Sequence, residues 1–444
     1  MDALIQAAQL ILSLSLLVVI HEFGHFMFAK LFGARVEKFY LFFNPWFSLF
    51  KYPRNAREDQ TEYGIGWIPF GGYVKISGMI DESMDKEAMK EEPKPYEFRS
   101  KPAWQRLLIM IGGVMMNLIL AIVIYSGISY TTGTSYISNS DIKDGYMYSE
   151  TAKEMGFKDG DKIVSVGEEV FDNYRQIPMA ILFNDAEYVK IERNGEQKKI
   201  YIDKSLFPAF LEKGNFILEL RLPIVIDSVL NESSAATAGL ARGDKIVAID
   251  STRVRYFDQL KPILEPKAGE IIAVTIDRDG QQLTKELSLS SDGTMGFYHS
   301  SDITGYYPIK TVKYTLLQSI PQGVKLAISQ VDNYLKQMKL IFTPETKAYK
   351  AVGSVVSMGS MFDSTWNWLH FWTITAFLSV ILAVMNILPI PALDGGHVLF
   401  LIYEVVTRRK PSDKFMEYAQ TAGMILLIGV MILALGNDIF KLFQ

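Results

Sequence analysis

His21-Glu22-Phe23-Gly24-His25 follows directly on an apolar run, Leu10 to Ile20, and the apolar character continues from Phe26 to Ala29. On a helix, the pattern H-E-x-x-H places two imidazoles on one face. There they can share a zinc ion, with the glutamate beside them as general base. Ionisable groups inside a membrane segment are costly and mark functional sites. The stretch therefore predicts a first transmembrane helix that carries a metal site within the bilayer.

A simpler interpretation treats these polar residues as caps or crossings at a helix interface. It is disfavoured because unpaired histidine and glutamate side chains are expensive in apolar surroundings.

The composition limits the chemistry that such a site can use. Hydrophobic residues make up 49% of the chain, the net charge is -4, and there are no cysteines. The charge gives no indication of a nucleic-acid partner. Without thiolates, a metal must be bound by histidine and carboxylate or amide groups. We therefore expect a few membrane spans joined to water-soluble modules.

Four apolar segments are long enough to cross a bilayer. We expect transmembrane helices over 1–30, 104–130, 367–397 and 415–437. Asp2 is the only early charge and no small-residue cleavage site follows the first run, so we expect a retained helix rather than a signal peptide. The short 398–414 loop carries Arg408, Arg409 and Lys410, and the 31–103 loop is also rich in basic residues. The positive-inside rule then places both loops in the cytoplasm and the 131–366 segment outside.

The 31–103 loop contains a Gly-rich stretch, 62–76, that reads as a β-hairpin with Gly71 and Gly72 in its turn. Its apolar positions, which include Trp67 and Val74, suggest that it dips into the membrane interface. An ordinary surface hairpin is the alternative.

The external segment contains an internal repeat. Gly156-Phe-Lys-Asp-Gly160-Asp-Lys-Ile-Val164 recurs as Gly239-Leu-Ala-Arg-Gly243-Asp-Lys-Ile-Val247. Two copies of this length indicate two small domains rather than a solenoid. The pattern resembles PDZ domains of bacterial proteases, which implies PDZ-like α+β domains over 131–208 and 209–300. Such domains bind extended peptides at a sheet edge, with 294–297 as a candidate carboxylate loop, or act only as a steric filter.

The 301–366 region follows the repeats. The spacing of Leu326, Val331, Leu335 and Met338 predicts an amphipathic helix there.

A catalytic zinc site needs a third protein ligand. Asp394 is the best candidate, because it lies in Asn386-Ile-Leu-Pro-Ile-Pro-Ala-Leu-Asp394-Gly-Gly-His397 at the end of the third span. The two prolines end the helix, and Gly395-Gly396 permits a close turn. His397 is a further candidate, as a ligand or as a hydrogen-bond donor to one. His299 falls in the soluble part, and His370 lies at the outer end of the third span.

These motifs occur in the order found in the site-2 protease family, and the chain resembles its bacterial members with tandem PDZ domains over essentially its whole length. The resemblance implies a zinc metalloendopeptidase with zinc ligands His21, His25 and Asp394. It implies Glu22 as general base and Asn386 near the reacting carbonyl. It also implies that the hairpin, with Gly71, Gly72, Tyr73 and Val74, pairs with an unwound substrate strand.

The resemblance further implies the setting of the reaction. The enzyme would lie in the bacterial inner membrane, with its active site near the cytoplasmic side and its PDZ domains in the periplasm. Substrates would be single-pass membrane proteins, such as trimmed anti-sigma factors, or remnant signal peptides. Peptide ligands of the PDZ domains are further expected partners.

Two other functions stay open at this point. A catalytically idle membrane scaffold could bind protein C-termini through its PDZ pair, although such a scaffold has no need of Glu22. A transporter or metal carrier could use the His/Asp cluster, although four spans without inverted repeats do not favour it.

Overall fold

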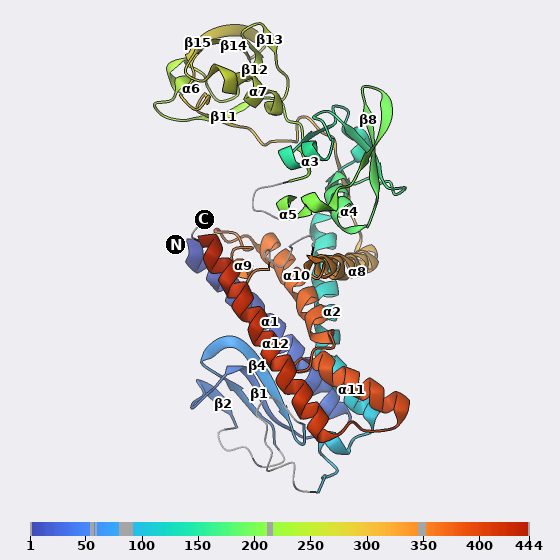
Figure 1. Cartoon of the computed structure of the whole chain (residues 1–444). Helices are drawn as coiled ribbons and strands as arrows, with labels where there is room; N and C mark the ends of the chain where they lie inside the picture. Colours follow the sequence, from blue (N-terminus) through green and yellow to red (C-terminus); the bar gives the residue numbers. More distant parts are fainter. Residues whose placement is uncertain are drawn as a thin grey trace. The chain divides into compact units, whose positions relative to one another are not determined.

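The computed structural model describes residues 2–53, 57, 60–79, 92–210, 216–344 and 352–442 (Figure 1). The chain forms two compact units. The first combines residues 1–134, 313–342 and 349–444, and the second consists mainly of residues 135–312.

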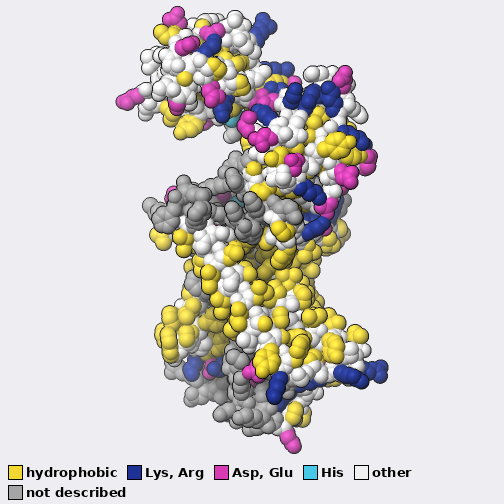
Figure 2. Space-filling model, viewed as in Figure 1, with side chains coloured by type: hydrophobic (Ala, Val, Ile, Leu, Met, Phe, Trp, Pro, Cys, Tyr) yellow, Lys and Arg dark blue, Asp and Glu magenta, His cyan; other side chains and the backbone are white. Residues whose placement is uncertain are grey.

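Within the described ranges, four helices of the first unit are long and apolar enough to cross a membrane. They are α1 (Asp2–Leu31), α2 (Ala103–Thr132), α10 (Trp368–Ile387) and α12 (Asp413–Leu442). Their number and order confirm the predicted spans. Hydrophobic side chains cover these helices in a broad band, and Lys and Arg side chains gather where α11 leads into α12 (Figure 2).

Helices α1 and α2 meet backbone to backbone. A methyl group on Gly24 would lie 2.1 Å from the carbonyl oxygen of Gly112, and one on Gly112 would lie 2.6 Å from that of Gly24. Small residues permit such an approach between membrane helices, where packing replaces the hydrophobic effect. The contact fixes α2 directly beside the H-E-x-x-H segment.

The third span ends just before the two prolines, as predicted, so the helix is shorter than the whole 367–397 segment. Helix α10 ends at Ile387, and a separate helix, α11 (Asp394–Thr407), occupies most of the segment expected as the 398–414 loop. Pro389 and Pro391 account for the break, because proline lacks the amide hydrogen that continues a helix. A short helix, α9 (Val355–Gly359), precedes α10.

The amphipathic helix after the repeats is α8 (Leu316–Ile341). Leu326, Val331 and Met338 pack on the core formed by α2 and α10, as expected. Leu335 is 46% exposed, and the neighbouring Tyr334 packs in its place. The inward face was therefore predicted correctly except at this position.

The 31–103 loop folds into a four-stranded sheet of order β2-β3-β1-β4, so the predicted 62–76 hairpin is wrong. The strands are β1 (Val36–Phe43), β2 (Phe50–Tyr52), β3 (Glu62–Ile65) and β4 (Ile68–Ile76). Strand β1 lies between β3 and β4, parallel to the first and antiparallel to the second. Gly71 and Gly72 lie within β4, not in a turn. Gly71 has φ +114°, and a methyl group there would contact the Phe43 ring at 2.7 Å.

In the second unit, each copy of the repeat forms a strand, a short helix, a strand, a second helix and a β-hairpin. The first copy has β6 (Tyr146–Tyr148), α3 (Glu150–Glu154), β7 (Lys162–Val166), α4 (Ile177–Phe183), β8 (Tyr188–Arg193), β9 (Glu196–Tyr201), α5 (Phe207–Phe210) and β10 (Leu218–Leu220). The second has β11 (Ile226–Val229), α6 (Ser234–Thr237), β12 (Lys245–Ile249), β13 (Thr252–Arg253), α7 (Leu260–Leu264), β14 (Ile271–Arg278), β15 (Gln281–Ser288) and β16 (Phe297–His299).

Two strand pairings refine the boundaries of this unit. Strand β10 pairs with β6, so residues 218–220 complete the first copy, and the boundary predicted at 208/209 lies too early. Strand β5 (Thr134–Ile137) pairs with β17 (Ile309–Val312), so the two ends of the unit lie side by side.

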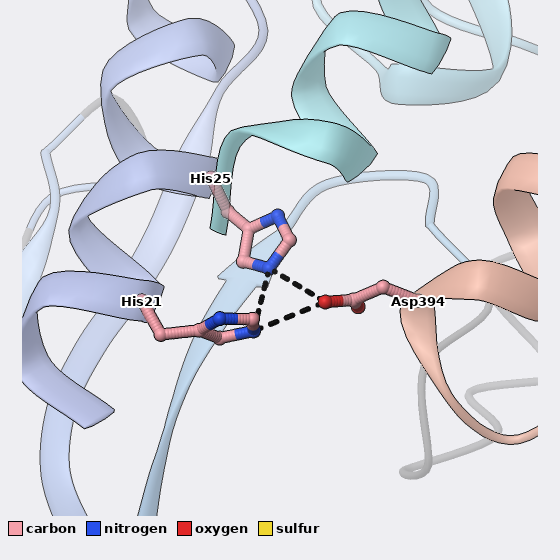
Figure 3. Close-up of side chains that lie close together, drawn as sticks. All are labelled: His21, His25 and Asp394. Carbon is pink, nitrogen blue, oxygen red and sulfur yellow. Dashed lines mark hydrogen bonds and ion pairs between the residues drawn. The ribbon is translucent and has the colours of Figure 1, made fainter. Parts of the chain in front are cut away.

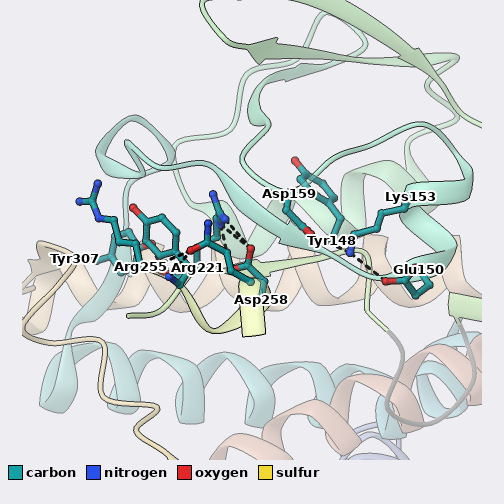
Figure 4. A network of polar contacts seen from close by, with 10 residues as sticks. Tyr148, Glu150, Lys153, Asp159, Arg221, Arg255, Asp258 and Tyr307 are labelled. Carbon is teal, nitrogen blue, oxygen red and sulfur yellow. Dashed lines mark hydrogen bonds and ion pairs between the residues drawn. The ribbon is translucent and has the colours of Figure 1, made fainter. Parts of the chain in front are cut away.

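Polar contacts hold the segment between the two copies. Arg221, just after β10, donates to Asp258 of the second copy at 2.6 Å, and the side chain of Asp258 is 4% exposed. The Tyr307 hydroxyl donates to the Arg221 carbonyl oxygen at 2.7 Å. Arg221, Asp258 and Tyr307 belong to the polar network in Figure 4.

The aspartate after the second glycine of the repeat is buried in each copy. Asp161 accepts from Arg193 at 2.6 Å, and Asp244 accepts from Arg278 at 2.6 Å. Each arginine also donates to the carbonyl oxygen of the first glycine of the motif, Gly156 or Gly239, at 2.9 Å. Each copy thus contains the same ion pair, between the buried aspartate of the repeat and a partly exposed arginine further along the chain.

We expect the second copy to loosen in acid. The hydrogen-bonded guanidinium of Arg278 lowers the pKa of the Asp244 carboxyl below its ordinary value. The pair therefore stabilises the fold at neutral pH, and this contribution is lost as the pH falls below about 4 and through the lowered pKa. Amide hydrogen exchange of β12 and β14 in the full-length protein should accelerate over this range. Asp244→Asn should exchange faster already at neutral pH, whereas Asp279→Asn should match the wild type. Equal exchange in Asp244→Asn and the wild type at neutral pH would contradict the expectation.

Candidate metal centre

Helix α1 presents two buried histidines to one point inside the first unit. His21 and His25 are 7% and 5% exposed, and their rings meet edge to face with centroids 4.9 Å apart. Their Nε2 atoms lie 3.2 Å apart. The helical i, i+4 spacing predicted from the sequence therefore brings the two imidazoles together.

Asp394 completes the cluster from the first turn of α11 (Figure 3). Its Oδ2 atom lies 3.0 Å from His21 Nε2 and 3.2 Å from His25 Nε2. Among the described residues, these three form the group of side chains that could hold a metal ion. The carboxylate is more than 360 positions from the histidines in sequence, so only the fold unites them.

The irregular segment between α10 and α11 positions Asp394. Ala392 has φ +87°, a conformation that side chains other than glycine rarely adopt. A methyl group on Gly395 would lie 2.0 Å from the Leu388 carbonyl oxygen, and one on Gly396 would lie 2.6 Å from Pro391 Cα. The predicted turn at Gly395-Gly396 is misplaced, because the chain turns just before Asp394 and both glycines lie in the first turn of α11. Their lack of side chains permits the close contact with the preceding segment.

Helix α2 forms the wall behind the histidines. The carbonyl oxygen of Ile109 accepts a hydrogen bond from His25 Nδ1 at 2.8 Å, which leaves His25 Nε2 for the cluster. A methyl group on Gly113 would lie 2.5 Å from His25 Nε2 and 2.6 Å from His21 Cε1. Only glycine leaves room for both rings at this position.

Glu22 follows His21 in the chain and contacts the sheet. Its carboxylate accepts a hydrogen bond from the backbone N–H of Val74 in β4. In an antiparallel strand, the N–H and C=O groups of one residue point to the same side. The edge of β4 that is not paired with β1 therefore faces Glu22.

The remaining predicted residues separate into near and distant groups. Asn386 Nδ2 lies 3.3 Å from His21 Nε2, so this amide borders the cluster. His397 is outside the cluster and lies 3.1 Å from Gln420 of α12, measured from Nε2 to Nε2. His370 contacts the Met361 carbonyl oxygen at 2.8 Å, and His299 stacks on Phe257 in the second unit.

The sequence pattern assigned no role to three contributors on α2: the Ile109 carbonyl, Gly113 and Asn117. Asn117 Nδ2 lies 3.3 Å from His21 Nδ1. A polar residue in the middle of an apolar span is the signal that points to Asn117. The two others act through backbone or through the absence of a side chain, so composition cannot reveal them.

The donor atoms match what zinc requires. Ligands at about 2.0–2.1 Å from one tetrahedral ion lie about 3.3 Å from one another. The three observed separations, 3.0, 3.2 and 3.2 Å, are close to that value. Asp394 Oδ2 is buried and, among the described residues, it has no hydrogen-bond partner apart from the two imidazoles. Two histidines and a carboxylate, with a side left for water, are a typical catalytic zinc set.

Comparison with known proteins agrees with this chemistry. The model of peptidase family M50 matches residues 9–430. The chain is 26% identical over 456 residues to the regulator of sigma E protease of Haemophilus influenzae, covering 97% of this chain and 98% of that protein. It is 25% identical over 467 residues to the protease RseP of Yersinia pestis, covering 100% of both. A Vibrio cholerae protein whose name describes a zinc metalloprotease is 26% identical over 458 residues, covering 97% of this chain and 98% of that protein.

The family match extends over nearly all of the chain and includes both the H-E-x-x-H segment and Asp394. The four long apolar helices found in the described residues make it a membrane protein. The chain therefore belongs to peptidase family M50, and it is a zinc metalloendopeptidase of the site-2 protease type.

Proposed function

We propose that this enzyme hydrolyses peptide bonds within the transmembrane segments of single-pass membrane proteins. The observation that carries the proposal is the His21, His25 and Asp394 cluster. Its donor atoms lie within 4.8 Å of one another, and both histidines lie on a helix long enough to span a bilayer. These three side chains would hold the zinc ion. When bound, zinc lowers the pKa of a bound water towards about 7 and polarises a carbonyl group.

Glu22 acts as the general base in this proposal. It takes a proton from the attacking water and passes it to the leaving amine. The hydrogen bond from the Val74 N–H holds the carboxylate beside the cluster. Asn386 Nδ2 lies 3.3 Å from His21 Nε2, where the amide can donate to the oxygen that gains charge in the transition state.

Strand β4 offers a binding edge for the substrate. A helical segment hides its carbonyl groups in hydrogen bonds, so it must unwind before attack, and an unwound segment can pair with an exposed sheet edge. Gly71, Gly72, Tyr73 and Val74 lie in this edge strand. Because the edge faces Glu22, a strand bound there would bring its backbone to the cluster.

Exposed aromatic residues support membrane insertion of the sheet. Trp46 is 90% exposed, and it stacks with Trp67, which also stacks with Phe47. Trp side chains favour the membrane–water interface, because they combine an apolar ring with a polar N–H group. The basic side chains after α11, Arg408, Arg409 and Lys410, favour the cytoplasmic side for this end of the first unit. The second unit would then lie in the periplasm of a bacterial inner-membrane protein.

The second unit would select substrates through its two PDZ-like copies. In the second copy, a cavity of about 480 Å³ lies between α7 and the segment leading into β16. Its apolar lining includes Leu230, Phe257, Leu260, Leu264, Met295 and Phe297. An extended peptide can bind such a cavity by adding to the edge of β16 that is not paired with β11. Relatives named as regulators of sigma E protease suggest trimmed anti-sigma factors as substrates, and remnant signal peptides share the single-pass topology.

Removal of the second unit should broaden substrate tolerance. Since β5 and β17 lie side by side, residues 138–308 can be replaced by a short Gly/Ser linker with little strain on the first unit. The full chain should cleave only a substrate with a short external segment. The shortened chain should also cleave one with a folded external domain. Loss of all cleavage by a shortened chain that still binds zinc would instead indicate recruitment by this unit.

The activity itself is tested with purified protein in detergent and a single-span test substrate. We expect cleavage that a zinc chelator abolishes and added zinc restores. Chelator-resistant cleavage would contradict the proposal.

A further inference from the structure

Asn117 of α2 is a buried amide that touches a zinc-site histidine. It is fully buried, with Nδ2 at 3.3 Å from His21 Nδ1. In the part of the chain that the structure describes, its Oδ1 atom has no hydrogen-bond partner. No hydrogen bond therefore holds the oxygen in its present position, and the amide can turn about its last bond.

The tautomer of His21 determines which amide atom of Asn117 can form a hydrogen bond with the ring. Its Nε2 points to the cluster, 3.0 Å from Asp394 Oδ2. When the Nε2 lone pair binds a metal, the neutral ring carries its hydrogen on Nδ1, and Nδ1 becomes a donor. An amide nitrogen cannot accept that hydrogen, whereas the amide oxygen can. A half-turn of the Asn117 amide about its last bond exchanges the positions of Oδ1 and Nδ2. Oδ1 can therefore lie next to His21 Nδ1.

The other histidine has the equivalent partner on the same helix. His25 Nδ1 donates to the Ile109 carbonyl oxygen at 2.8 Å. Residues 109, 113 and 117 are spaced four apart, so they lie along one face of α2. This face thus offers a carbonyl for His25, the space at Gly113 for both rings, and the amide of Asn117 for His21. The Ser379 hydroxyl of α10 donates to the Asn117 carbonyl oxygen at 2.7 Å and steadies the backbone there.

We propose that Asn117 is a positioning residue. Its amide oxygen accepts a hydrogen bond from His21 Nδ1 and fixes the tautomer and ring orientation that present Nε2 to zinc. The inference rests on the proposed assignment of His21 as a zinc ligand. Hydrogen-bond partners of this kind typically change metal affinity 10- to 100-fold when removed.

Zinc affinity of the full-length protein, measured by chelator competition in detergent, tests this role. Asn117→Leu keeps the volume and removes the acceptor, and we expect its Kd for zinc to rise about 10- to 100-fold. Asn117→Asp keeps an acceptor, and its Kd should stay at or below the wild-type value. Thr375→Val removes another buried hydroxyl of α10 that has no hydrogen-bond partner among the described residues, and its Kd should not change.

A packing role predicts the opposite order. The Asn117→Leu protein would then bind zinc like the wild type. The Asn117→Asp protein would bind zinc less well, because it contains an additional buried carboxylate. That order would overturn the inference. Asn117→Ala, which adds no bulk, provides the same comparison where leucine disrupts the fold. Failure of the wild type to bind zinc, or normal binding by Asp394→Ala, would overturn the proposed ligands as well. If the wild type binds zinc and Asn117→Leu binds zinc with the same affinity, only the role of Asn117 would be overturned.

Discussion

Glu22→Gln is expected to abolish peptide cleavage while zinc remains bound. Glutamine has nearly the same shape as glutamate, and its amide oxygen can still accept the hydrogen bond from the Val74 N–H. It cannot take a proton from water, and loss of a general base typically costs 10²- to 10⁴-fold in rate. The measurement is turnover of a single-span substrate by wild type and variant, at equal zinc content determined by elemental analysis.

The zinc determination is the control for this variant. A protein that holds one zinc per chain has kept His21, His25 and Asp394 together, so lost turnover can be assigned to the missing carboxylate. Turnover near the wild-type rate would show that another group accepts the proton, and the role of Glu22 would then be wrong.

Asp394→Ala is expected to lower zinc occupancy strongly. The change removes the only carboxylate of the described cluster and leaves two imidazoles, which are too few for a catalytic zinc site. Cleavage should fall with occupancy, because no other side chain of the described cluster can take the third position. The measurement is zinc content after dialysis against a moderate chelator.

A matched change on the same helix separates ligand loss from damage to α11. Glu404 also lies on α11, and it accepts from Arg106 at 2.5 Å, away from the cluster. Glu404→Gln keeps an acceptor for this arginine and should retain wild-type zinc content. Full occupancy in Asp394→Ala would move the third ligand elsewhere, and equal loss in both variants would point to a general disturbance of the helix.

The sequence predicted four apolar helices and a cluster of His21, His25 and Asp394, and both are present in the described residues. H-E-x-x-H and the aspartate before Gly395-Gly396 can be recognised from residue type and local spacing. The four helices can be located from the length of the apolar segments alone. The repeat is equally local, because its glycines and buried aspartates recur in the same order. For these three features the signal lies within a short stretch of sequence, and the prediction and the structure agree.

The features that could not be predicted depend on contacts between residues far apart in the sequence. The 62–76 stretch looks like a hairpin, yet β3 and β4 each pair with β1, which precedes them by about twenty residues and has no clear alternation. Gly71 looked like a turn residue, but its positive φ serves a close contact with Phe43 inside a strand. Helix α11 was not predicted, because the basic residues at its end are typical of a cytoplasmic loop. The contributions of Ile109 and Gly113 depend on a helix contact that no local pattern encodes.

The most direct test of intramembrane proteolysis is the position of the cut. A single-pass substrate is incubated with purified wild-type protein, and the masses of both products are determined. We expect one cut within the apolar segment, towards its cytoplasmic end, and no products in the presence of a zinc chelator. A cut confined to the water-soluble flanks of the substrate would contradict the account, because the cluster would then act on chains outside the bilayer.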